Sequence, residues 1–108
     1  MDATLPAIAD RRRRRILELV AHDELSAGEI ASHFDVSRPA ISQHLSVLKN
    51  ANLLHERREG TRRFYRARRE ALDELRDYLE HFWDDHLDRL KRAAEAKERT
   101  QADGPDQR

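Results

Sequence analysis

Apolar residues between positions 5 and 22 recur at helical spacing, which places them on one face of a helix. Asp10 interrupts this pattern immediately before a run of arginines, Arg11–Arg15. An aspartate in that place can accept hydrogen bonds from the first free backbone amides of a helix. The pattern therefore predicts either one helix with a break or two helices, the second capped by Asp10.

Two more helices, joined by a tight turn, are predicted next. Ser26 and Glu29 form the S-x-x-E pattern of a capping box, which indicates a helix start at Ser26. Ser37 is a second capping residue, and Pro39 lies in the first turn, where its missing N–H costs nothing. The following stretch has the i, i+4, i+7 stripe of an amphipathic helix, formed by Ile41, Leu45 and Leu48.

The spacing of apolar residues changes from a helical to a strand pattern after this helix. Residues 53–59 and 62–68 flank Gly60-Thr61 and read as a two-stranded hairpin. From Glu70 to about Ala96 the helical period returns in one long stripe. Residues 99–108 are polar and include Gly104-Pro105, so we expect a disordered tail after a domain of residues 1–98.

The composition bounds the class of protein. A chain of 108 residues fits one domain, and with 39% charged and 6% aromatic residues its core is thin. We therefore expect a second copy of the chain to cover part of the apolar surface. The absence of cysteine excludes disulfides and thiolate metal sites and fits a cytoplasmic protein. No apolar run approaches the roughly 20 residues that span a bilayer.

Charge is sorted along the chain although the net charge is zero. Residues 1–55 are neutral overall, residues 56–69 carry seven arginines against two glutamates, and residues 70–108 are net acidic. A local basic element matters more to a polyanion than the total charge does. The hairpin is therefore a candidate for contact with nucleic acid.

The predicted order of elements is that of a mostly helical winged helix-turn-helix, with about five helices and a two-stranded wing. In such a motif the second helix enters the DNA major groove, and the wing approaches the backbone. Gln43 can pair with adenine, Ser42 with base or phosphate, and Ser37 and Lys49 with phosphates. The candidate DNA-binding residues are Ser37, Arg38, Ser42, Gln43, His44, Lys49, Arg57, Arg58, Gly60, Thr61, Arg62 and Arg63.

The run LSAGEIASHFDVSRPAISQHLSVLKNANLL, followed by RREGTRRFYR, resembles the ArsR family of winged-helix repressors. The resemblance covers roughly residues 5–92. It implies a homodimer on an imperfect inverted repeat of double-stranded DNA, with recognition through Ser42, Gln43 and His44. It also implies a dimer interface built from the first and last helices, with the candidates Leu5, Ile8, Leu75, Leu79, Phe82, Trp83, His86 and Leu90.

The chain departs from the metal-sensing members of that family. The stretch Leu25 to Ile30 lacks the cysteine motif that many of them carry. Asp84 and His86 match the first half of a zinc pattern, but Lys97 and Thr100 occupy the second half, and half a site cannot give tetrahedral zinc four ligands. We therefore expect no metal and no cofactor, and we read His81, Asp84, Asp85 and His86 as ordinary polar residues.

No enzyme motif is present: the sequence has no cysteine nucleophile, Gly-rich phosphate loop, H-E-x-x-H or G-x-S-x-G. The prediction is thus a DNA-binding repressor that acts as a homodimer, with an effector left open. The alternatives are a metal- or small-molecule-responsive sensor that uses the last helix, and a winged helix that binds proteins rather than DNA. Residues Arg11–Arg15 fit either a solvated, salt-bridged surface or phosphate contacts.

Overall fold

The computed structural model describes the backbone of residues 2–102 and the side chains of residues 2–98. The chain divides into an N-terminal unit, Met1–Leu75, and a C-terminal unit, Arg76–Arg108. The N-terminal unit holds every element up to the start of the last helix, and each unit is described here by itself.

The first helical stretch is two helices, α1 (Thr4–Ile8) and α2 (Arg11–Leu19). Asp10 separates them, because its carboxylate accepts hydrogen bonds from the backbone N–H of Arg12 at 2.7 Å and of Arg13 at 3.2 Å. Those amides have no partner within the helix, so the carboxylate fixes where α2 begins. The second of the two sequence interpretations is therefore confirmed.

Helices α3 (Ala27–Ala31) and α4 (Arg38–Asn50) form the helix-turn-helix. The capping box is complete, since Ser26 Oγ accepts from the Glu29 amide at 3.1 Å and the Ser26 amide donates to Glu29 Oε1 at 2.8 Å. Ser37 caps α4 by accepting from the Ala40 amide at 3.3 Å. After α4, Asn52 adopts a φ of 67°, a left-handed conformation that asparagine tolerates at helix ends.

The sheet has three antiparallel strands in the order β1-β3-β2. The predicted hairpin is β2 (Leu54–Glu59) and β3 (Arg62–Ala67), and Gly60 takes a φ of 65° in its two-residue turn. The sequence did not reveal β1 (Leu25–Ser26), because two residues carry no period. β1 pairs with Phe64 and Tyr65 of β3 and so joins the hairpin to the helix-turn-helix.

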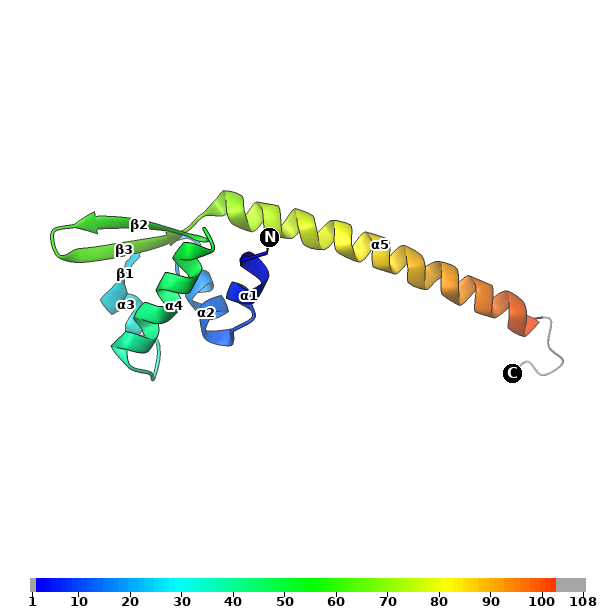
Figure 1. Ribbon diagram of the computed structural model, residues 1–108, viewed down its shortest axis with the longest axis horizontal. Coiled ribbons are helices and arrows are strands. Elements are labelled where there is room, and N and C mark those ends of the chain that lie inside the picture. Colours follow the sequence, from blue (N-terminus) through cyan, green and yellow to red (C-terminus); the bar gives the residue numbers. More distant parts are fainter. Residues whose placement is uncertain (1, 103–108) are drawn as a thin grey trace. The chain divides into compact units, whose positions relative to one another are not determined.

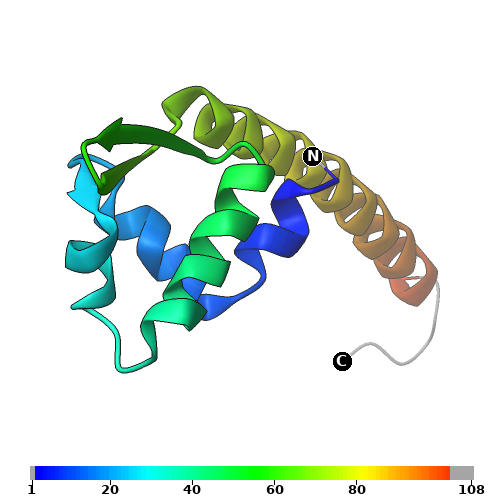
Figure 2. The same ribbon diagram turned by 60° about the vertical axis from the view of Figure 1, so that its left-hand side comes forward.

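The core of the N-terminal unit lies where α4 packs on α1, α2 and α3, as Figures 1 and 2 show. All three stripe residues predicted for α4 are buried in it. Two backbone hydrogen bonds attach the end of β3 to the segments that follow α2 and α4. The Ala67 amide donates to the Val20 carbonyl, and the Arg68 amide donates to the Leu53 carbonyl. The buried apolar residues are Ala7, Ile16, Leu17, Val20, Ile30, Ile41, Leu45, Leu48, Leu53, Leu54, Tyr65, Ala67 and Ala71.

The last helix, α5, spans Arg69–Ala102 (Figure 1). It continues six residues beyond its predicted end near Ala96, because five of the six added residues are lysine, glutamate, arginine, glutamine or alanine, which favour helix. Residues 99–102, assigned to the tail from the sequence, therefore belong to the helix, and the rest of the predicted tail, 103–108, lies outside the described residues. In its described part the C-terminal unit is this one helix, and residues 76–98 are all exposed.

Candidate DNA-binding surface

Helix α4 turns a polar face to solvent. Ile41, Leu45 and Leu48 point into the core, so the residues between them lie outward. Ser42 and Gln43, both predicted to read bases, are exposed, and so is Ser46 one turn further on. Small hydroxyls and a carboxamide are side chains that pair with base edges in the major groove.

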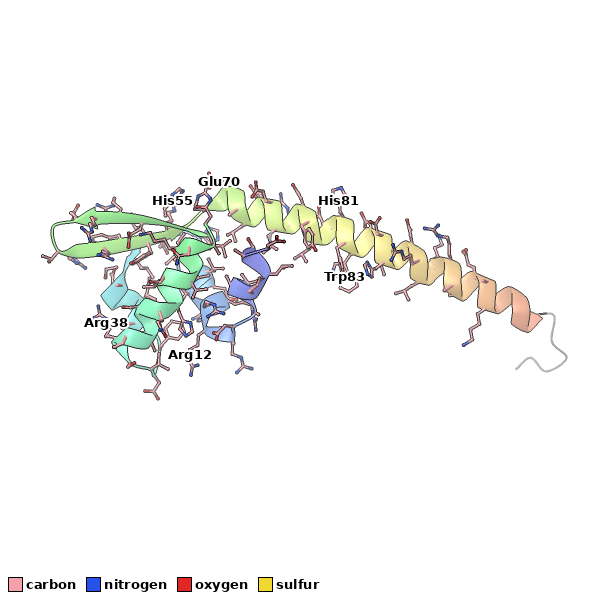
Figure 3. All side chains as sticks on the ribbon, in the orientation of Figure 1. Arg12, Arg38, His55, Glu70, His81 and Trp83 are labelled. Atoms are coloured by element: carbon pink, nitrogen blue, oxygen red, sulfur yellow. The ribbon has the colours of Figure 1, made fainter. Side chains whose placement is uncertain are left out.

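The outward face of α4 and the hairpin together line an open groove of about 510 Å³. Six of the predicted DNA-binding residues are brought together in it: Arg38, Ser42, Lys49, Thr61, Arg62 and Arg63. Ser26, Ala27, Gly28, Leu45, Ser46, Glu56 and Tyr65 complete its lining. Figure 3 shows Arg38 at the start of α4, below the hairpin. The surface thus combines a polar helix face with cations from a separate element.

The two faces of the hairpin carry different arginines. Arg58 and Arg63 are directly opposite across the strands, and two like charges in that position repel each other. Within residues 2–98, Arg58 forms no ion pair, whereas Arg63 lies 3.6 Å from Glu56. Arg57 and Arg62 share the other face, where their guanidinium carbons lie 4.6 and 4.9 Å from the Phe64 ring centroid. A phosphate beside Arg58 and Arg63 would relieve the repulsion between them.

Arg57 differs from the other wing arginines because acidic side chains hold it within the fold. It donates to both carboxylate oxygens of Glu24, at 2.8 and 3.0 Å, and to Glu59 at 3.1 Å. The hydrogen bond from Arg57 lowers the pKa of Glu24 below its ordinary value, and Glu24 in turn raises the pKa of Arg57. The structure therefore gives Arg57 a partner that competes with its predicted phosphate contact.

Glu56 organises the floor of the groove and was missed in the sequence. It accepts hydrogen bonds from Lys49 Nζ and from the Tyr65 hydroxyl, each at 2.8 Å, and lies 3.6 Å from Arg63. The hydrogen bond from Lys49 is the main reason that the pKa of Glu56 lies below its ordinary value. Its position opposite Tyr65 was a usable signal, since a glutamate within an arginine-rich strand implies a cross-strand partner. The Glu56 carboxylate therefore competes with a phosphate for Lys49, whose ammonium group has three N–H donors.

Two predicted contact residues serve the fold as well as the surface. The Ser37 hydroxyl accepts the capping hydrogen bond, and its own proton stays available for a phosphate oxygen. His44 is half-buried, and its Nδ1 lies 3.3 Å from Arg13 Nη1 of α2, away from the groove lining. Sequence periodicity alone does not distinguish His44 from the exposed Gln43 beside it.

The predicted dimer residues fall into two groups. Ile8 and Leu75 are half-buried, whereas Leu5 is exposed. On α5, the side chains of Leu79, Phe82, Trp83 and Leu90 are 38–63% exposed. Phe82 is the centre of a ring cluster with Tyr78, Trp83 and His86, at centroid distances of 6.3, 6.2 and 4.0 Å. The cluster is an exposed apolar surface that no other side chain among residues 76–98 covers.

The polar residues of α5 do not converge on one point. His81 Nδ1 donates to the Asp77 carbonyl at 2.8 Å, which raises the pKa of His81. Figure 3 shows His81 and Trp83 leaving α5 on opposite sides. Within residues 2–98, no three histidine, aspartate or glutamate side chains gather closely enough to hold a metal ion. The described helices also include none with the length and apolar character needed to cross a membrane.

Comparison with known proteins agrees with this geometry. The model of the bacterial regulatory protein arsR family matches residues 10–56, which span the helix-turn-helix and the start of the wing. The HTH-type transcriptional regulator Rv2034 of Mycobacterium tuberculosis is 49% identical over 82 residues, 76% of this chain and 77% of that protein. The transcriptional repressor SdpR of Bacillus subtilis is 35% identical over 82 residues, 76% of this chain and 91% of SdpR.

The solved structures include similar folds. An ArsR-like transcriptional regulator from Rhodococcus sp. RHA1 superposes with a TM-score of 0.69 at 30% identity, and the match covers 86% of this chain and 91% of that one. The sequence prediction of an ArsR-type winged helix-turn-helix is therefore confirmed. The chain belongs to the ArsR family of bacterial transcriptional regulators.

Proposed function

We propose that this regulator is a repressor that binds an inverted-repeat operator as a homodimer. The observation that carries the proposal is the groove in which the polar face of α4 meets Arg62 and Arg63 of the wing. Base-reading groups and phosphate-binding cations then act from one surface, as direct readout requires. A winged helix that binds only proteins has no need of this combination.

The homodimer is supported by the width of the α5 stripe. Leu79, Phe82, Trp83, Leu87 and Leu90 are all exposed, and they cover a broader arc than the two positions per heptad of a simple coiled-coil seam. A stripe of that width fits contact with more than one helix. A second copy supplies two suitable helices, its own α5 and its α1, on which Leu5 is exposed.

Repression follows from the geometry of such a dimer. A twofold axis would place the two α4 helices about one DNA turn apart, roughly 34 Å, so that each reads one half of an inverted repeat. A dimer bound across a promoter excludes polymerase from the same DNA. An effector would change occupancy only by binding one dimer geometry better than the other.

Fluorescence anisotropy with a labelled duplex from upstream of the protein's own gene tests the proposal. A scrambled duplex of the same composition is the control, and both are measured at two salt concentrations. We expect tighter binding to the native duplex, with affinity for both falling as salt rises because phosphate contacts release counterions. Equal affinity for the two duplexes, or none, across a tiled set of neighbouring promoter segments would contradict sequence-specific repression.

A further inference from the structure

The arginine run at the start of α2 has a specific structural role that neither surface hydration nor phosphate binding describes. Arg13 Nε donates to the Ala7 carbonyl at 2.5 Å and Nη2 to the Pro6 carbonyl at 3.1 Å. Arg14 Nη1 donates to the next two carbonyls, of Ile8 at 2.8 Å and Ala9 at 3.1 Å. Together the two side chains bind the last carbonyls of α1, of which Pro6 also accepts from the Ala9 amide, at the helix end where cations are favoured.

Only one of these two arginines also reaches the DNA-reading helix. Arg13 Nη1 lies 3.3 Å from Nδ1 of His44, which precedes the buried Leu45 of α4. A guanidinium group has hydrogen-bond donors and no acceptor, and it stays protonated in proteins. His44 Nδ1 must therefore accept, and the ring proton of the neutral imidazole is on Nε2. The Asp10 carboxylate also lies close enough to His44 for an electrostatic interaction.

We propose that Arg13 is a positioning residue for DNA reading, which holds His44 in the Nε2–H tautomer so that α4 offers a hydrogen-bond donor to an acceptor on a base. Within residues 2–98, no group accepts a hydrogen bond from His44 Nε2, and the side chain is only half-buried. The major-groove acceptors of matching type are guanine O6 and N7, adenine N7 and thymine O4. The inference rests on the proposed function, since it needs α4 to meet bases.

The same contact ties α1 to α4. One guanidinium group binds the carbonyls of Pro6 and Ala7 and the ring of His44, so α1 cannot shift without moving a base-reading side chain. Loss of Arg13 should then change two properties: the tautomer of His44 and the discrimination between operator and random DNA.

Arg13→Met removes the donors and keeps an unbranched side chain, and Arg14→Met is the matched control. Arg14 caps the same end of α1 but has no contact with His44. Nitrogen-15 NMR of the imidazole rings reports the tautomer without DNA, and His44→Asn identifies the His44 signals among six histidines. We expect the Nε2–H form in the wild type and in Arg14→Met, and a mixture of tautomers in Arg13→Met.

Anisotropy on operator and scrambled duplexes gives the second measurement. Arg13→Met and His44→Asn should each weaken operator binding about five- to tenfold relative to Arg14→Met, with random DNA unchanged. The double variant should lose no more than either single variant, because both remove one interaction. Thermal melts check that each variant is folded: a melting temperature equal to that of Arg14→Met excludes unfolding as the cause of weaker binding.

The outcomes separate the inference from the proposed function. A mixture of tautomers in the wild type, an unchanged ring in Arg13→Met, or additive losses in the double variant would overturn the inference while leaving the repressor intact. A wild type that does not distinguish operator from scrambled DNA would overturn the proposed function, and the use of His44 on DNA with it.

Discussion

The N-terminal unit and the exposed length of α5 use apolar residues in opposite ways. In the first, residues such as Ile16, Ile30 and Leu48 are completely buried by neighbouring elements of the same chain. In the second, Phe82 is 41% and Trp83 is 56% exposed. Apolar patches of this kind, when contiguous on a protein surface, mark interaction sites.

This difference indicates that the two regions have different tasks. The N-terminal unit closes its own core and carries the groove between α4 and the wing, so it can present DNA-reading groups without help from a partner. The stripe on α5 becomes buried only when another surface covers it. We therefore expect changes in one region to alter DNA reading or fold stability, and changes in the other to alter assembly.

The largest expected effect comes from Phe82→Ala. The proposed dimer loses two aromatic side chains, and at about 2 kcal/mol for burying each one the cost is about 4 kcal/mol, roughly a thousandfold in the dimer dissociation constant. Sedimentation equilibrium measures this constant. Asp88→Ala, on the face of α5 opposite the middle of the apolar stripe, is the control and should leave it unchanged. An unchanged dimer dissociation constant in Phe82→Ala would show that the stripe is not part of the dimer interface.

Next in size is Leu48→Ala in the core of the N-terminal unit. Deleting a completely buried leucine side chain leaves a cavity and lowers the free energy of unfolding by about 2–5 kcal/mol. The neighbouring Val47 is 39% exposed, so Val47→Ala should cost less than about 1 kcal/mol. Urea unfolding of both variants checks the difference, and equal losses would mean that α4 faces the other way.

A smaller effect is expected for Gln43→Ala, which should act on DNA reading alone. Loss of a paired base contact costs about 1–3 kcal/mol on the operator and little on random DNA. Anisotropy on both duplexes measures the loss, and sedimentation should give the wild-type dimer constant. If binding to both duplexes falls equally, Gln43 contacts backbone rather than bases.

The smallest effect separates two neighbouring wing arginines. Arg58 has no ion pair among the described residues, whereas Arg57 binds Glu24 and Glu59. Arg58→Ala should therefore reduce the slope of log affinity against log salt by about one unit, and Arg57→Ala by clearly less. The comparison fails if the two substitutions change the slope equally.

Local patterns predicted the fold better than the site. Asp10, the Ser26–Glu29 capping box and the stripe of α4 are interactions within a few residues, and the structure has each of them. The short strand β1 escaped prediction because its only evidence is its pairing with β3, about forty residues further along the chain.

At the site, the sequence identified which residues are polar or basic but could not show how they are paired. Glu24 lies 33 residues from Arg57 and Arg13 lies 31 residues from His44, so neither contact leaves a local signal. The end of α5 was placed too early because its polar composition was interpreted as disorder. Lysine, glutamate and alanine are also strong helix formers, so a polar stretch of this kind can continue a helix.

The central claim is that two chains, joined through the exposed stripe of α5, read one operator. Native mass spectrometry of the full-length protein with its operator duplex tests it most directly, because the mass of the complex counts the chains. We predict two chains per duplex for the wild type, and a loss of that complex in Phe82→Ala under the same conditions. A specific complex that contains a single chain, or two chains that persist in Phe82→Ala, would contradict the account.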